Sequence, residues 1–585
     1  MTLKRPFMLR SVLLASILSL TSMVPVIAKD TAGARALMSY DAIHHPVMSD
    51  NGMVSAQDRI AAEVGRDILA RGGNAIDAAV ATGFALSVTH PQAGNLGGGG
   101  FMMVHLAETG EVIALDFREM APAGATRDMY IGGDGEVDNQ LAQYSRLSAG
   151  VPGTVMGLLE ALENYGTMTR REVMGPSMRL AAKGFPLSYA LAESLESNRE
   201  QMSVDESSIE YFLGRSAGEK LIQRDLAQSL RRIMNSGVDG FYSGKTADLI
   251  VAEMQKGKGV MTLEDLANYK TVTRKPVTGN YKNHKLYAMS PPSSGGVHIV
   301  QMLNILSGYD LQADGHNSAA YLHKLIEAMR RAYADRSKYL GDPDFVNVPV
   351  SELTAQSYAD DLREIISSTA ASKSSDISPG AKLPYESVNT THYSVIDKEG
   401  NAVSVTYTLN FSFGSGYSVD GAGFLLNNEM DDFSAKPGSP NGYGLIGGQA
   451  NKIEPRKRPL SSMTPMIVKK DGKVVLATGS PGGSTIITSV LQMVLNVIEW
   501  DMNLAEAVNK PRIHHQWLPD VVITEPGISI DTLNGLSTMG HNLPKDKNGG
   551  YAHTVLGRVN SVGQTADIVV GSADPRGPDS AAVGH

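Results

Sequence analysis

The chain has no cysteine among its 585 residues and only two tryptophans. Without thiols it can form no disulfide, no thiolate metal site and no cysteine-based covalent intermediate. It also lacks long runs of lysine or arginine, and its 52 basic and 61 acidic residues give a net charge of -9. This balance argues against nucleic acid or an anionic membrane surface as a partner. Any covalent chemistry therefore falls to serine, threonine or a carboxylate.

The N-terminal residues 1–28 show the three parts of a secretory signal peptide. Three basic residues precede an apolar run at 12–27, and the small residue Ala28 follows it. Such a segment is normally cleaved after a small residue, so we expect a mature protein in the periplasm or secreted, with no membrane segment. The alternative is an uncleaved anchor helix, but serines, a threonine and Pro25 interrupt a run that is short for a bilayer span.

The rest of the chain has the composition of a globular protein, with 42% hydrophobic and 19% charged residues. Apolar residues at helical spacing follow Asp58 and stop at the Gly72-Gly73 pair, which predicts a capped amphipathic helix. A second helix is expected from about Asn74 towards Val88. Its alanines permit close packing.

Three pairs of apolar segments, each joined by a short turn that ends in glycine, predict β-hairpins. These pairs are 101–106 with 111–117, 392–397 with 401–409, and 466–470 with 474–478. Helical patterns dominate 155–260 and 317–335, and 484–500 is best interpreted as a buried helix. The order shows no βαβ alternation and no repeat of fixed period, so we predict an α+β protein with antiparallel sheets covered on their faces.

Common catalytic and binding motifs are absent or incomplete. No Gly-x-Ser-x-Gly elbow occurs, which excludes the usual start of an α/β-hydrolase triad. Residues 243–246 end like a phosphate loop, but Asp239 stands where the first glycine is required. The histidine pairs at 44–45 and 514–515 are adjacent, so their side chains point in different directions. We therefore predict no metal site and no cofactor.

Residues 366–380 are rich in serine and end in Pro379-Gly380, a composition typical of a mobile connecting loop. Soon after it, an extended stretch begins at Thr390-Thr391. Taken alone, two β-branched residues at that point predict only the start of a strand.

Four longer blocks of sequence resemble a known family. They are Leu-Asp-Phe-Arg-Glu-Met-Ala-Pro at 115–122, Asn-Thr-Thr-His-Tyr-Ser at 389–394, Pro-Leu-Ser-Ser-Met-Thr-Pro at 459–465, and Gly-Ser-Pro-Gly-Gly-Ser at 479–484. These blocks are similar to the signatures of the gamma-glutamyltranspeptidases, a family that includes glutathione hydrolases and cephalosporin (glutaryl) acylases. The similarity runs from about Ala56 to Arg576, which is nearly the whole mature chain.

The resemblance implies an N-terminal-nucleophile (Ntn) hydrolase with a four-layer αββα sandwich. It places a self-cleavage site between Asn389 and Thr390, giving a large subunit of residues 29–389 and a small subunit of residues 390–585 in one interlocked heterodimer. Chemistry is consistent with this, because a chain-terminal threonine carries its own base, an α-amine whose ordinary pKa is about 7.7–8.0. In the uncut chain that nitrogen is an amide, so the precursor should be inactive.

The resemblance also assigns the residues around the nucleophile Thr390. Thr408, at the end of the next strand, would hydrogen-bond its hydroxyl, and the backbone N–H groups of Gly482 and Gly483 would stabilise a tetrahedral oxyanion before the helix near Ser484. Without the resemblance, Thr408 is one more strand threonine and the glycines are a turn that caps a helix.

A γ-glutamyl substrate offers an α-carboxylate and an α-ammonium. An arginine fork suits the carboxylate and acidic or amide oxygens suit the cation. On the family pattern the carboxylate would be held by Arg118, Ser461 and Ser462, and the ammonium by Asn410, Glu429 and Asp432. Glu429 departs from the glutamine that is common in the family, which leaves its contact open. Taken singly, Arg118 could instead form a structural salt bridge with Asp116 or Glu119.

The glycine-rich segment 437–448 has a composition unsuited to regular structure. It resembles the loop that covers the glutamyl pocket in bacterial members of the family, with Tyr443 as its gate. A flexible surface loop has the same composition.

We therefore expect Thr390 to form a γ-glutamyl-enzyme from glutathione or a related γ-glutamyl compound. Water, or an amino acid or dipeptide acceptor, would then take the γ-glutamyl group. The alternative within the family is a cephalosporin (glutaryl) acylase. An alternative of another class is a relative that does not process itself and acts as a periplasmic binding protein.

Overall fold

The computed structural model describes residues 2, 42–377, 390–565 and 568–585. Apart from Thr2, the predicted signal peptide lies outside the described residues, as does Asn389. Residues 37–585 group into one unit, and the description below concerns that unit. Within the described residues, no helix combines the length and the apolarity needed to cross a membrane.

Two antiparallel sheets form the centre of the described chain, each with seven strands. The first has the order β18-β2-β10-β11-β3-β4-β7 and the second the order β1-β17-β16-β13-β12-β9-β8. The first sheet contains β2 (Gly52–Ala56), β3 (Gly99–His105), β4 (Val112–Phe117), β7 (Val272–Arg274), β10 (Thr391–Asp397), β11 (Ala402–Thr408) and β18 (Ala581–Gly584). The second contains β1 (Val47–Ser49), β8 (Val277–Tyr281), β9 (His284–Ala288), β12 (Met466–Lys470), β13 (Lys473–Thr478), β16 (Ser561–Thr565) and β17 (Ile568–Ser572).

All three predicted hairpins are confirmed: β3 pairs with β4, β10 with β11, and β12 with β13. Every residue of β10 and β11 is buried. The two strands still alternate polar and apolar residues, because Ser404, Thr406 and Thr408 of β11 lie on the face opposite Val403, Val405 and Tyr407.

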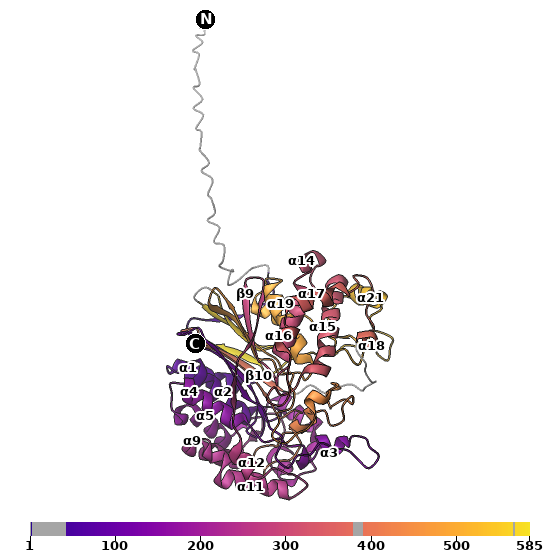
Figure 1. Cartoon of the computed structure of the whole chain (residues 1–585). Coiled ribbons are helices and arrows are strands. Elements are labelled where there is room, and N and C mark those ends of the chain that lie inside the picture. Colours follow the sequence, from indigo (N-terminus) through magenta and orange to yellow (C-terminus); the bar gives the residue numbers. More distant parts are fainter. Residues whose placement is uncertain (1, 3–41, 378–389, 566–567) are drawn as a thin grey trace. The chain divides into compact units, whose positions relative to one another are not determined.

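Helices cover the outer face of each sheet (Figure 1). On the first sheet lie α1 (Arg59–Ala70), α2 (Ala75–Thr89) and α4 (Thr154–Tyr165), with α5 (Arg170–Lys183) and α9 (Arg224–Ser236) packed behind them. Against the second sheet lie α13 (Gly295–Leu306) and α20 (Leu504–Asn509), and on α13 pack α15 (Ala319–Tyr339), α17 (Gln356–Glu364) and α19 (Thr485–Ile498). The two larger hydrophobic clusters follow these layers. One joins the first sheet to its helices, and the other joins the helices of the second layer to residues of both sheets. The result is the four-layer αββα arrangement predicted from the sequence.

The first two helices begin where the sequence predicts. The Asp58 side chain accepts a hydrogen bond from the Ala61 N–H at 2.9 Å and caps α1. Asn74 and Asp77 form a reciprocal capping box at the start of α2. All residues of α2 are buried, because the alanine-rich helix lies between the first sheet and α5.

One expectation is wrong for its described part. Residues 366–380 were expected to form a mobile loop, yet Ala371 donates to the Met539 carbonyl at 2.7 Å and the indole of Trp517 donates to the Ser374 carbonyl at 2.9 Å. A short helix, α18 (Ser374–Ile377), follows. Serine-rich composition predicts poor core formation, but it does not exclude anchoring through backbone and hydroxyl hydrogen bonds.

Candidate active site

Thr390 lies directly before β10, at the start of an inner strand. The pairing of Thr391 with Tyr407 brings Thr390 next to Thr408, the last residue of β11. The two hydroxyl oxygens are 3.4 Å apart, and both residues are buried. The Thr408 hydroxyl also accepts the Asn410 N–H at 2.8 Å, which fixes its orientation. The structure thus places the predicted nucleophile beside its predicted hydrogen-bond partner.

The turn before α19 depends on glycine. Gly482 has φ of 136° and Gly483 has φ of 54°, conformations that side chains strongly disfavour. A Cβ atom on Gly483 would lie 2.5 Å from the ring of Tyr443. Glycine is therefore required both for the turn and for the close approach of Tyr443, and α19 begins two residues later with its N-terminus at the turn.

Arg118 follows β4 and is fully buried at the centre of what we call the Arg118 cluster (Arg118, Glu119, Glu429 and Asp432). Its two terminal nitrogens donate to Glu429 and Asp432, and a Glu119 oxygen lies 3.6 Å away. The Asp116 carboxylate does not form an ion pair with the Arg118 guanidinium. It accepts a hydrogen bond from the Arg118 backbone N–H at 2.9 Å and forms an ion pair with Arg274.

The cluster has more acidic than basic groups. Burial raises the pKa of Glu119 to about 7, and it raises the pKa of Glu429 and of Asp432 above their ordinary values, although Arg118 opposes each shift. Burial alone would lower the pKa of Arg118, but the surrounding carboxylates raise it. One arginine cannot pair with three carboxylates, so burial holds the surplus carboxyl groups towards their protonated form until a further positive charge enters the cluster.

Ser461 and Ser462 lie beside this cluster, and a residue that the sequence did not single out joins them. Arg336, near the end of α15, donates to the Ser462 hydroxyl at 3.2 Å and to the Ser294 hydroxyl at 3.0 Å. A charged residue in a helix whose other face is apolar is a weak signal, which is why sequence reasoning missed it.

The predicted lid segment 437–448 contains neither a helix nor a named strand, only an isolated bridge between Pro440 and Ile446. The Tyr443 hydroxyl donates to the Asn410 carbonyl at 2.6 Å. The Gly442 N–H donates to Asp431 at 2.8 Å. These bonds hold the segment over the site.

One cavity brings the predicted residues together. It is lined by Arg118, Arg336, Thr390, Thr408, Asn410, Glu429, Asp432, Tyr443, Leu445, Ser461, Ser462, Met463, Gly483 and Ile486. Of the residues predicted for the site, Gly482 lies behind the lining in the adjoining turn, and Asn389 is outside the described residues. The predicted nucleophile, part of the predicted oxyanion turn and the Arg118 cluster therefore share one cavity.

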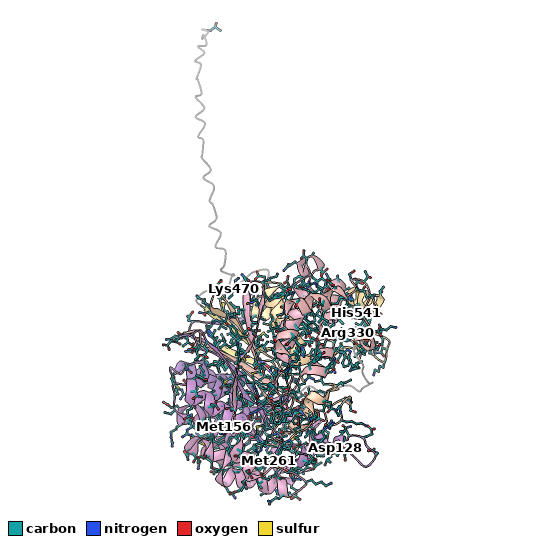
Figure 2. The ribbon with its side chains drawn as sticks, in the orientation of Figure 1. Asp128, Met156, Met261, Arg330, Lys470 and His541 are labelled. Atoms are coloured by element: carbon teal, nitrogen blue, oxygen red, sulfur yellow. The ribbon has the colours of Figure 1, made fainter. Side chains whose placement is uncertain are left out.

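One group of side chains in the described chain has the composition of a metal site: His323, Glu327 and His541. Two arginines already bind both oxygens of Glu327, with Arg331 at 2.6 Å and Arg330 at 3.3 Å. Figure 2 shows Arg330 and His541 close together. The positive charge of these arginines opposes a cation, and the two histidines hydrogen-bond each other at 2.8 Å. The group fits a structural network better than a metal centre.

The αββα layers and a threonine at the start of an inner strand define the class of Ntn hydrolases. Residues 61–584 match the family model described as gamma-glutamyltranspeptidase, so the chain belongs to that family. It is 49% identical to a glutathione hydrolase proenzyme of Escherichia coli (strain K12) over 99% of this chain and 100% of that protein. It is 36% identical to an acylase ACY 1 proenzyme of Pseudomonas sp. (strain SE83) over 85% of this chain and 88% of that protein.

Solved structures agree with this assignment. A cephalosporin acylase from Bacillus halodurans superposes with a TM-score of 0.81 at 27% identity, over 94% of this chain and 99% of that one. A Helicobacter pylori gamma-glutamyltranspeptidase chain has a TM-score of 0.54 at 46% identity, over 55% of this chain and 93% of that one. The fold is thus shared by both branches, and the site must distinguish them.

Proposed function

We propose that the chain is a self-processing γ-glutamyltransferase and glutathione hydrolase. The observation that carries this proposal is the 3.4 Å contact between the Thr390 and Thr408 hydroxyls in the same cavity as the Arg118 cluster. The first feature supplies a nucleophile and the second suits a group with both a carboxylate and an ammonium.

Processing would begin when the Thr390 hydroxyl attacks the carbonyl carbon of Asn389. The bond from that carbon to the Thr390 nitrogen breaks as an ester forms, which frees the Thr390 amine. Water then hydrolyses the ester to the Asn389 carboxylate and the Thr390 hydroxyl. After export to the periplasm and removal of residues 1–28, the products would be residues 29–389 and 390–585. They would stay together, because β10 of one piece pairs with β2 of the other, and β11 pairs with β3.

In turnover the free amine of Thr390 takes the proton of its own hydroxyl, which attacks the γ-carbonyl of the substrate. The N–H groups of Gly482 and Gly483 would stabilise the oxyanion. The amine returns the proton to the leaving nitrogen, cysteinylglycine departs from glutathione, and a γ-glutamyl ester remains on Thr390. Water releases glutamate, or an amino acid or dipeptide accepts the γ-glutamyl group. Each step uses groups of the chain itself, without a cofactor.

Substrate recognition would rearrange the Arg118 cluster. The α-carboxylate takes the place of Glu429 and Asp432 on the guanidinium of Arg118, with the hydroxyls of Ser461 and Ser462 as further donors. The α-ammonium then binds the carboxylates so released, together with the side-chain oxygen of Asn410. Tyr443 closes the cavity over the glutamyl group.

A glutaryl acylase is the alternative from the same family, and the solved acylase shows that the fold permits it. A glutaryl group has a carboxylate but no ammonium. It would leave the acidic excess of the Arg118 cluster without a counter-charge, which favours the γ-glutamyl substrate.

The test of processing compares two neighbouring threonines. Purified wild-type protein should run as two pieces on a denaturing gel, whereas Thr390→Ala should remain one inactive piece. Thr391→Ala is the matched control, because its hydroxyl has no hydrogen-bond partner among the described residues and its side chain lies on the other side of the strand. We expect it to cleave and turn over. Wild-type protein that stays in one piece would rule out the mechanism.

The test of substrate class compares p-nitroaniline release from the γ-glutamyl and glutaryl amides. We expect kcat/KM for the γ-glutamyl amide to be larger by a factor of about 100, the usual consequence of leaving a buried charge unpaired. Equal rates would favour the acylase alternative.

A further inference from the structure

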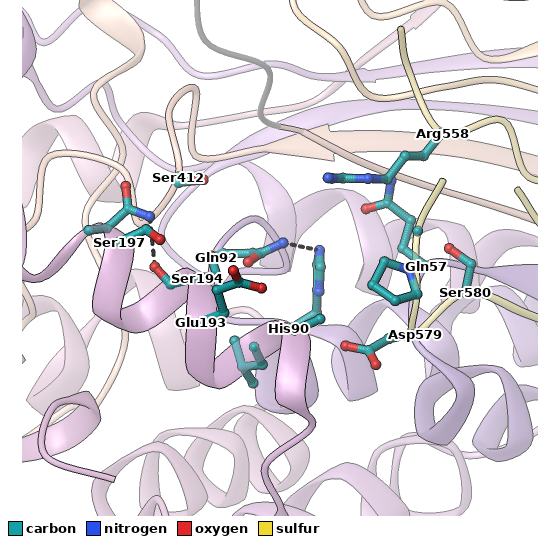
Figure 3. A pocket seen from close by; sticks show the side chains of 15 residues that line it. Gln57, His90, Gln92, Glu193, Ser194, Ser197, Ser412, Arg558, Asp579 and Ser580 are labelled. Atoms are coloured by element: carbon teal, nitrogen blue, oxygen red, sulfur yellow. Dashed lines mark hydrogen bonds between the residues drawn. The ribbon is translucent and has the colours of Figure 1, made fainter. Parts of the chain in front are cut away.

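A second cavity of about 390 Å³ shares no lining residue with the candidate active site among the described residues. It lies between the ends of β2 and α2, the helix α6 (Tyr189–Ser197) and two C-terminal loops. Figure 3 shows its polar lining, and the charged or amide side chains are Gln57, His90, Gln92, Glu193, Asn198, Arg558 and Asp579. The proposed reaction uses none of them.

Gln57 is the feature that points to a ligand. Its side chain is 3% exposed, and neither its amide nitrogen nor its amide oxygen has a hydrogen-bond partner within the described part of the chain. The Ser580 hydroxyl, on the same wall, is also unpartnered there. Buried polar groups almost always have partners, because an unmet one destabilises the fold by about 1–3 kcal/mol. A bound molecule with both a donor and an acceptor would satisfy them.

Arg558 gives the cavity a positive end. Burial lowers the pKa of its guanidinium, and its Nε atom has no hydrogen-bond partner among the residues described. Asp574 does not neutralise it directly, since that carboxylate binds Arg512 and Arg576 at 2.7 and 3.0 Å. In Figure 3 the guanidinium extends towards the pair Gln92 and His90. A guanidinium in this setting suits a carboxylate.

The opposite side of the cavity is negative. Glu193 lies on α6 and is exposed to solvent, and Asp579 accepts the Ser188 hydroxyl through one oxygen at 2.6 Å. Both carboxylates lie across from Arg558 in Figure 3. His90 adds no charge, because burial and then the charge of Arg558 lower its pKa to about 3. The cavity therefore has one positive and one negative end with amides between them.

We propose that this cavity is a second binding site, separate from the active site, for a free α-amino acid. The carboxylate of the ligand binds Arg558 and the amide of Gln57, and its ammonium binds Asp579 and Glu193. The proposal does not depend on the chemistry of Thr390.

The test measures binding of L-alanine to the processed protein by isothermal titration, and compares wild type with Arg558→Gln and Gln57→Met. We expect saturable binding that weakens about tenfold in Arg558→Gln, as for the loss of a charge-assisted pair. Gln57→Met should weaken binding several-fold and leave the thermal midpoint unchanged or higher, because it removes buried amide atoms that have no partner. Arg171→Gln, which changes an exposed arginine on α5, is the control and should bind as wild type.

Two analogues test the two ends of the cavity. Propionate lacks the ammonium and ethylamine lacks the carboxylate, and each should bind more weakly than L-alanine. The proposal is overturned if wild type shows no saturable binding, if both cavity variants bind as the control does, or if propionate binds as tightly as alanine. It is also overturned if Arg118→Lys, and not Arg558→Gln, abolishes binding, because the ligand would then lie in the active site. Hydrolysis of the γ-glutamyl amide is measured separately, so its absence would defeat only the proposed function.

Discussion

Two buried arginine clusters in this molecule differ in charge balance and in how fully their hydrogen bonds are met. In the Arg118 cluster one arginine meets three carboxylates. Both oxygens of Glu119 and one of Glu429 have no hydrogen-bond partner among the described residues. The cluster lines the cavity that contains Thr390.

The other cluster, called the Arg512 cluster, contains Arg512, Glu525, Asp574 and Arg576, two positive and two negative groups. Asp574 accepts from the side chains of both arginines and from the Val559 N–H at 2.8 Å. Glu525 accepts from Arg576 at 2.6 Å and from the N–H groups of Arg512 and Leu556. Every carboxylate oxygen of this network accepts at least one hydrogen bond. The network joins three loops near the C-terminus.

The difference separates structure from function. A neutral and saturated network has no capacity for a ligand and contributes to the fold. An acidic and unsaturated one is incomplete until something binds, at a cost in stability that only function explains. The comparison predicts that substitutions in the Arg512 cluster change stability, and that substitutions in the Arg118 cluster change activity.

The largest expected effect is in the Arg512 cluster. Asp574→Asn removes the charge between two buried arginines and leaves them facing each other. We expect the free energy of unfolding to fall by about 3–5 kcal/mol, as when one partner of a buried pair is removed. Urea denaturation measures it, with Asp471→Asn in an exposed turn as the control. A loss below 1 kcal/mol with a large loss of activity would reverse the assignment of the two clusters.

Arg118→Lys tests whether the Arg118 cluster serves activity and not stability. Lysine keeps the positive charge but loses the planar fork that can bind a carboxylate through two hydrogen bonds. We expect kcat/KM for the γ-glutamyl amide to fall roughly 100-fold, about 2.7 kcal/mol, with the thermal midpoint close to that of wild type. Steady-state kinetics on the processed protein measure it. If Arg118→Lys unfolds as Asp574→Asn does, the cluster is structural and the comparison fails.

Much of this could be predicted from the sequence. The hairpins were visible because two-residue periodicity and glycine turns are local, and the caps at Asp58 and Asn74 depend on residues within one helical turn. The site was visible through motifs, which named Thr390 and Arg118 although 272 positions, 390 less 118, separate them in the chain.

The remaining features depend on contacts that no local pattern encodes. Arg336 reaches the site only because α15 ends beside Ser462. Glu119 follows Arg118 in the sequence, yet nothing there shows that its carboxylate would be buried in the same cluster. The cavity at Arg558 joins segments from residues 57 and 580, and the anchoring of Ser374 depends on a distant tryptophan.

The smallest expected effect is a change in pH dependence at Glu119. Its pKa in the folded chain is about 7, above the ordinary 4.5, because burial opposes its charge. The unfolded chain therefore ionises first, and the stability that the protonated carboxyl provides is lost as pH rises from about 4.5 to about 7. Glutamine cannot ionise, so Glu119→Gln should escape this loss.

Relative to wild type, Glu119→Gln should thus gain stability between pH 5 and pH 8. Thermal midpoints at the two pH values measure the difference, and Glu163→Gln, an exposed glutamate on α4, should show none. If the thermal midpoint of Glu119→Gln shows no more pH dependence than that of Glu163→Gln, a neighbouring group already hydrogen-bonds or neutralises the Glu119 carboxylate. The Arg118 cluster would then be as saturated as the Arg512 cluster, and its acidic excess could not be the feature that selects an ammonium-bearing substrate.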